Sequence, residues 1–260
     1  MINLQSKYET FEPLLLQFCE ETVKIEIDGD FSTIFLPHTM VGYGTAPKKV
    51  FYFGRDTNGW NKTKELMQFF RDNQLNKYID DNSTWINQYG FLDYNNNAAL
   101  GFWTLVINLH LHIKGVNEIV RVDDSLYDSD FLDLLNDFGY GNTNSIEIKQ
   151  SLQNQGIWQN LSVPAYLTIK EKSLKFDKLK YTIQAYKPDL IFIFNWSANA
   201  DDFLEGLNYT VTKLDVLNNH FWVYDLYDIK TKLIWTIHPR TLYFNKTTLN
   251  KIIDIILNHI

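Results

Sequence analysis

The chain contains the run Asp189-Leu190-Ile191-Phe192-Ile193-Phe194, in which every position after the aspartate is apolar. A strand that is apolar on both faces is typical of the centre of a parallel sheet covered by helices. Pro188 precedes the run and disfavours a helical conformation at Lys187, so it separates this strand from a helix predicted over residues 173–186. This segment therefore indicates an α/β fold.

Further strands and helices follow on both sides of this run. Short β-forming runs predict strands over residues 50–53, 156–161, 221–226 and 233–237. Apolar residues at helical spacing predict helices over residues 11–22, 62–79, 98–113, 127–138, 198–207 and 249–257. Residues 80–97 are expected to be irregular, and Gly139-Tyr140-Gly141 is expected to stop the helix before it. The alternation of strands and helices predicts a parallel sheet between two helical layers.

Size and composition favour one globular domain over residues 1–260. The chain has 260 residues, of which 45% are hydrophobic, and no linker rich in Pro, Gly or Ser divides it. The single cysteine, Cys19, excludes an internal disulfide and a four-thiolate metal site. A net charge of −7 argues against coating nucleic acid by bulk attraction, but not against a local basic surface. With no apparent signal peptide and no apolar run of bilayer length, we expect a cytoplasmic protein without membrane contact.

Polar residues follow the predicted strands directly, and in a parallel sheet such residues converge on one crevice. The residues of interest are Asp56, Asn160, Asn195 and His238. Asp56 lies in a glycine-bounded loop, where a carboxylate can orient water and stabilise a developing sugar cation; an Asx turn or helix N-cap is the alternative. His238 precedes a proline, which favours an extended backbone, although a His-Pro pair can also simply end a strand. Together, a carboxylate and a histidine suit hydrolysis of a glycosidic bond.

The order of these motifs resembles the uracil-DNA glycosylase superfamily from about residue 50 to the C-terminus. The matching features are Gly54-Arg55-Asp56 after a strand, Asn160-Leu161, the run 187–194, and His238-Pro239 before a final helix. The resemblance implies a three-layer α/β/α sandwich with a central, mainly parallel four-stranded sheet. It also implies an enzyme that acts on a base flipped out of DNA and that needs neither a metal nor a cofactor.

The resemblance implies a role for each matched residue. Asp56 falls where the family activates or orients water, and His238 falls where a histidine stabilises the departing base. Asn160 falls near the asparagine that reads the flipped base. The other implied substrate contacts are Gly54, Arg55 and Asn58, with Trp60 as a stacking ring and Arg240 on a phosphate. Leu242 is implied as a wedge that fills the space left by the flipped base, and the alternative is a buried residue that starts the last helix.

This sequence also departs from the family pattern. The family's proline after the catalytic position is Thr57 here, Arg55 replaces a glutamine, and Arg240 replaces the serine after His-Pro. Two segments, near residues 80–97 and 115–154, are expected to be insertions that reshape the pocket or form a partner surface. These departures imply that the base removed need not be uracil.

We therefore predict a DNA glycosylase that removes uracil or a modified pyrimidine from single- or double-stranded DNA, in repair or in defence against foreign modified DNA. Two alternatives remain open. One is a module on the same scaffold that binds nucleic acid or a nucleotide without cleaving it, which the acidic balance and altered motif would suit. The other is a hydrolase or transferase of free nucleosides.

Overall fold

The structure is a computed structural model that describes residues 30–32, 37–54, 62–63, 84, 86–92, 100–122, 130–143, 148–149, 178–195, 204, 206–227, 229–240 and 248–260. The helices and strands, in chain order, are β1 (Asp30–Ser32), β2 (His38–Thr39), η1 (Val41–Thr45), β3 (Val50–Gly54), β4 (Lys62–Thr63), η4 (Gly90–Leu92), α3 (Leu100–Ile113), η6 (Leu132–Leu135), β5 (Phe138–Asn142), β6 (Ile148–Lys149), α5 (Lys178–Tyr186), β7 (Leu190–Asn195), β8 (Tyr209–Leu214), β9 (Phe221–Leu226), β10 (Lys232–Ile237) and α7 (Leu249–Leu257).

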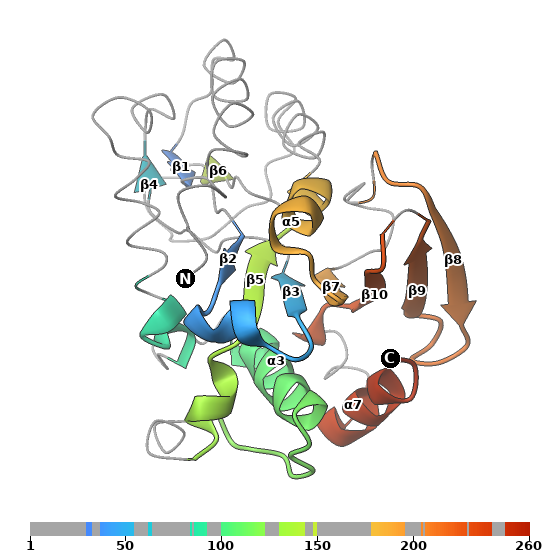
Figure 1. Cartoon of the computed structure of the whole chain (residues 1–260). Helices are drawn as coiled ribbons and strands as arrows, with labels where there is room; N and C mark the ends of the chain where they lie inside the picture. The colour runs from blue at the N-terminus through green and yellow to red at the C-terminus, as the bar shows by residue number, and fades with distance from the viewer. Residues whose placement is uncertain are drawn as a thin grey trace.

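A mixed seven-stranded sheet forms the centre of the molecule, in the order β2-β5-β3-β7-β10-β9-β8 (Figure 1). Four neighbouring strands, β5, β3, β7 and β10, are parallel to one another. The outer strands β2, β9 and β8 are antiparallel to their neighbours. The α/β class is therefore confirmed, whereas the predicted total of four strands is wrong. Strands β8, β9 and β10 are joined by short connections, which reverse the chain direction and so produce antiparallel pairs.

Helices cover the two faces of this sheet, as adjacent residues of β3 demonstrate. The ring of Phe51 packs against Tyr186 of α5, with centroids 5.5 Å apart. Tyr52 points the opposite way and contacts His110 of α3, 5.9 Å away. Successive strand residues face opposite sides, so α5 and α3 lie on different faces. Helix α7 packs beside α3 (Figure 1). All five residues of β3 are buried, as a strand between two helical layers requires.

Several predicted elements are confirmed. Strand β7 lies between two parallel neighbours and is buried along its whole length. The strands predicted at 50–53, 221–226 and 233–237 are β3, β9 and β10, and the helices predicted at 98–113 and 249–257 are α3 and α7. The predicted helix at 173–186 contains α5, and Lys187 ends it with a positive φ of 47°. The predicted elements at 11–22 and 156–161 lie outside the described residues.

The largest difference concerns residues 138–142. We predicted that a helix would run to Phe138 and that two glycines would stop it, but Phe138–Asn142 is strand β5, paired in parallel with β3. The glycines serve packing: a Cβ on Gly139 would lie 2.1 Å from the ring of Phe51, and one on Gly141 2.8 Å from that of Phe53. This part of the expected insertion at 115–154 therefore belongs to the central sheet.

Other segments also differ from expectation. Within the expected irregular insertion at 80–97, Ile86, Phe91 and Leu92 are buried, and the last two lie in η4. The predicted helix at 62–79 does not include its first two residues, because Lys62–Thr63 form β4. Strand β4 pairs with β1, and β1 with β6, in a small antiparallel sheet. The edge strand β8 was not predicted.

Candidate functional site

The four parallel strands end at one edge of the sheet, which we call the carboxyl edge. It is formed by Asn142 at the end of β5, Gly54 at the end of β3, Asn195 at the end of β7, and His238 just after β10. The strand register places Gly54 beside Asn142 and Ile237 beside Asn195. Residues from distant parts of the chain thus meet at the edge where ligands bind in parallel α/β sheets.

Asn142 is the most informative residue at the carboxyl edge. Its side chain is buried, with 1% of the residue exposed. The Oδ1 atom accepts a hydrogen bond from the Tyr140 hydroxyl at 3.2 Å. Its Nδ2 atom has no hydrogen-bond partner in the structure as described. A buried donor without a partner destabilises a protein by about 1–3 kcal/mol, so such a group at a strand end points to a ligand that supplies the acceptor.

Gly54 makes room for this carboxamide. A Cβ at position 54 would lie 2.8 Å from Asn142 Oδ1 and 3.4 Å from the ring of Phe102 in α3. Any larger residue would therefore displace the amide. Phe102 in turn packs edge-on against Phe194 of β7, with centroids 5.9 Å apart. The amide of Asn142 consequently lies close to an aromatic wall on the α3 face of the sheet.

His238 is fixed at the carboxyl edge by its own backbone. Its N–H donates to the carbonyl oxygen of Asn195 at 2.8 Å, which extends the ladder between β7 and β10 by one residue. Its Nδ1 atom accepts a hydrogen bond from the backbone N–H of Arg240 at 3.2 Å. An imidazole that accepts at Nδ1 in its neutral form carries its proton on Nε2. In the neutral ring of His238 the proton is therefore on Nε2, which can donate a hydrogen bond.

Asn195 has a structural role at the same edge. It is fully buried, and its Oδ1 atom accepts a hydrogen bond from the indole Nε1 of Trp235 at 2.5 Å. Trp235 lies on β10, so this bond ties the ends of β7 and β10 together. Of the two asparagines at the carboxyl edge, Asn142 alone has a buried amide nitrogen without a partner among the described residues.

The structure places three of the predicted site residues. Gly54 and His238 both lie at the carboxyl edge, two strands apart, and the register puts His238 two residues beyond the level of Gly54, so their backbones are roughly 12 Å apart. Arg240 is exposed and helical, directly after Pro239, which is helical as well. The other predicted residues, Arg55, Asp56, Asn58, Trp60, Asn160 and Leu242, lie outside the described residues.

Sequence reasoning missed Asn142 because the neighbouring glycines were interpreted as a helix stop. The signal that would have found it is the pattern Phe138-Gly139-Tyr140-Gly141-Asn142, in which large and small residues alternate with the period of a strand and end at a polar side chain. The glycines on one face oppose the phenylalanines of β3, which could only be known once β5 was paired with β3.

Comparison of the chain with protein-family models, curated proteins and solved structures gives no match. The described ranges contain no cluster of three or more His, Cys, Asp or Glu side chains able to hold a metal ion. No helix among the described residues is both long and apolar enough to cross a membrane.

Proposed function

We propose that this protein is a DNA glycosylase that hydrolyses the N-glycosidic bond of uracil or a modified pyrimidine in DNA. The observation that carries the proposal is the buried Asn142 amide nitrogen without a partner, at the same sheet edge as the Nε2 donor of His238. The four inner parallel strands, with helices on both faces, agree with the scaffold expected of a uracil-DNA glycosylase-like fold.

Asn142 suits the recognition of a pyrimidine that carries a carbonyl group at C4. The target base must first leave the duplex stack and enter a site that reads its hydrogen-bonding edge. The Nδ2–H group of Asn142 can donate to the carbonyl oxygen at C4 of uracil, whereas cytosine has an amino group at C4, which offers no acceptor. Tyr140 holds the other end of the amide and so fixes its orientation. We therefore expect uracil-like bases to be accepted and cytosine to be refused.

His238 suits the stabilisation of the departing base. As the glycosidic bond breaks, its electron pair moves onto the base, and negative charge develops on a carbonyl oxygen of the ring. A neutral Nε2–H donor held in advance stabilises that charge without reorganisation. A water oxygen attacks the sugar carbon and transfers a proton to Asp56, the base predicted from the sequence two positions after Gly54.

A screen of base release tests the proposal. Oligonucleotides that carry uracil, thymine, cytosine or modified pyrimidines, as single strands and duplexes, would be incubated with the full chain. Released bases would be identified by mass spectrometry and abasic sites by alkaline cleavage. We expect release of at least one keto pyrimidine, and a much slower release in His238→Ala. DNA binding without any released base would favour the non-catalytic module, and release from free nucleosides alone would favour a nucleoside hydrolase.

A further inference from the structure

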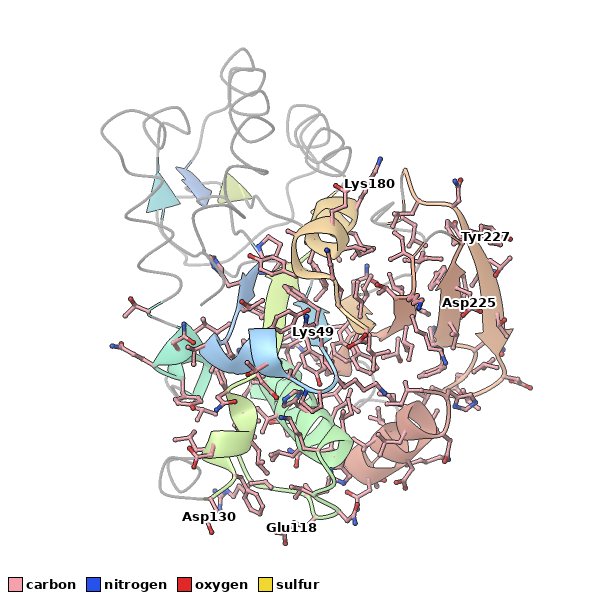
Figure 2. All side chains as sticks on the ribbon, viewed as in Figure 1. Lys49, Glu118, Asp130, Lys180, Asp225 and Tyr227 are labelled. Carbon is pink, nitrogen blue, oxygen red and sulfur yellow. The ribbon has the colours of Figure 1, made fainter. Side chains whose placement is uncertain are left out.

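The two edges of the central sheet are very different. At one edge β2 has only two residues, whereas at the other β8 has six, with no proline or glycine. Tyr209 to Lys213 are all exposed. Three of the six exposed large hydrophobic residues in the described chain lie here: Tyr209, Val211 and Tyr227, the last of which Figure 2 shows beside β8. A long, exposed edge strand is a template for pairing with another chain, because its outward N–H and C=O groups are unpaired.

The hydrogen bonds of the β8–β9 hairpin identify the free backbone groups. The N–H of Tyr227 donates to the carbonyl oxygen of Asn208, so Asn208 bonds towards β9. Because the bonding direction alternates along an antiparallel strand, Thr210 and Thr212 also bond towards β9. Tyr209, Val211 and Lys213 consequently present their N–H and C=O groups outward. Within the described part of the chain, no strand pairs with these six groups.

We propose that β8 pairs antiparallel with β8 of a second copy of this chain, about a two-fold axis that passes through Val211. This register lets each strand use all six outward groups, because Val211 faces Val211 of the second copy and Tyr209 faces Lys213 of the second copy. The two seven-stranded sheets become one continuous sheet. Such an isologous pairing closes on itself and leaves the short strand β2 at both outer edges.

The side chains of β8 are complementary to themselves in this register. On one face each Tyr209 ring meets Lys213 of the second copy, which permits a cation–π contact. The Lys213 ammonium already lies 3.9 Å from the ring centroid of Trp222, and Tyr209 packs edge-on against Tyr224 at 5.4 Å. The lysine would therefore lie between two aromatic rings. On the other face, Thr210 meets Thr212 of the second copy, a favourable cross-strand pair.

Other registers satisfy fewer of these groups. A shift of the register by one residue would place Tyr209 of one copy on the opposite face of the sheet from Lys213 of the second copy. A shift of the axis to Thr212 would bring Val211 opposite Lys213 and would separate Tyr209 from the lysine. A single strand pair is small for a stable interface, so we expect a dimer whose population depends on concentration.

The oligomeric state of the full chain tests this proposal. Sedimentation velocity over a concentration series should show a monomer–dimer equilibrium. Val211→Pro removes an outward N–H that the monomer does not use, so it should raise the dissociation constant at least tenfold without unfolding the protein. Tyr227→Ser, in the same exposed region but outside the pairing, should leave the constant unchanged. A monomer at every concentration, or a dimer that Val211→Pro does not weaken, would overturn the proposal.

A cysteine pair tests the register independently of the proline variant. In a Cys19→Ser background, Val211→Cys would place two thiols across the two-fold axis, with Cα atoms about 5.5 Å apart, which is within the range of a disulfide. Lys213→Cys is the matched control, since the Cα atoms of its two copies would be roughly 15 Å apart. Mild oxidation should cross-link most of the first variant and little of the second. Equal cross-linking of both would contradict the register.

Discussion

The imidazole of His238 is held in one orientation by a hydrogen bond from the backbone of Arg240, two residues later in the chain. Because Nδ1 accepts a hydrogen bond from the Arg240 N–H, the proton of the neutral ring is on Nε2. The proposed mechanism assigns this donor to the developing charge on the base. Its removal is therefore a test of chemistry rather than of folding, since the ring is only half-buried.

His238→Ala should lower the rate constant of base release by about a hundredfold to a thousandfold, the usual effect of deleting one preorganised donor. Asp56→Asn should remove most activity as well, because it deletes the predicted water-orienting carboxylate. Single-turnover assays would measure both, with thermal unfolding as the control. His238→Gln keeps an amide donor and should lose less. Full activity in both His238→Ala and Asp56→Asn would exclude the mechanism.

Gly54 and Asn142 should behave as a coupled pair. Gly54→Ala places a methyl group 2.8 Å from Asn142 Oδ1, which should destabilise the protein by about 1–3 kcal/mol and displace the amide. In the double variant with Asn142→Ala the clash is relieved, so stability should recover relative to Gly54→Ala while activity stays low. Urea unfolding and base-release assays on the four proteins would measure both. Strictly additive changes in stability would contradict the contact.

At the scale of elements, the glycines of β5 allow this strand to lie against β3. A Cβ at Gly139 would lie 2.1 Å from Phe51 ring atoms, against 2.8 Å from Phe53 for Gly141. Gly139→Ala should therefore reduce the free energy of unfolding by about 3 kcal/mol or more, the upper end of the usual cost of overpacking. Gly141→Ala should reduce it by less. Phe51→Leu should partly restore Gly139→Ala, since it removes the clashing ring. Urea titrations would show this, and equal effects of both glycines would count against the packing.

A buried network of hydrogen bonds joins α3 to the central sheet, away from the carboxyl edge. The Tyr52 hydroxyl donates to His110 Nδ1 at 3.1 Å, and His110 Nε2 donates to Asp137 Oδ1 at 2.8 Å. Lys114 forms an ion pair with the same carboxylate. Burial alone would raise the pKa of Asp137, but hydrogen bonds from His110 and Lys114 outweigh it and lower the pKa. Burial lowers the pKa of His110, which keeps the ring neutral.

At the scale of the whole molecule, these buried groups predict sensitivity to acid. Burial lowers the pKa of His38 from 6.5 to about 3, and that of His110 is lowered by the same cause. Below pH 6.5 the unfolded chain binds protons that the folded chain excludes, so stability must fall as the pH falls. Each histidine contributes up to about 1.4 kcal/mol per pH unit between its folded pKa and 6.5.

The free energy of unfolding, measured by urea titration between pH 7 and pH 4, should therefore decrease steadily. His38→Gln and His110→Gln should each remove up to one of the protons taken up on unfolding. The free energy of unfolding should then depend less steeply on pH, even if each variant is less stable at neutral pH. Asp137 adds to the same trend at lower pH, because its pKa is lowered and its ion pair is lost on protonation. A flat profile between pH 7 and pH 4 would contradict the burial of neutral histidines.

The sequence alone determined the elements whose pattern is local. The apolar run of β7 and the helical spacing of α3 and α7 depend on neighbouring residues, and all three were predicted correctly. The convergence of strand ends was also foreseen in principle, and Gly54 and His238 lie at one edge. Strand β5 was not predicted, because the reason for its glycines is the pair of phenylalanine rings on β3, nearly ninety positions earlier in the chain.

Only the tertiary structure decided which asparagine lies beside Gly54 and how many strands the sheet contains. Asn142 and Asn195 both follow buried strands in the sequence, yet one amide bonds to Trp235 and the other keeps an unpaired nitrogen. A hydrogen bond between distant residues depends on strand order and register, which no local pattern encodes. The same holds for β8, whose exposed alternating residues become informative only when it is known to be the edge of the sheet.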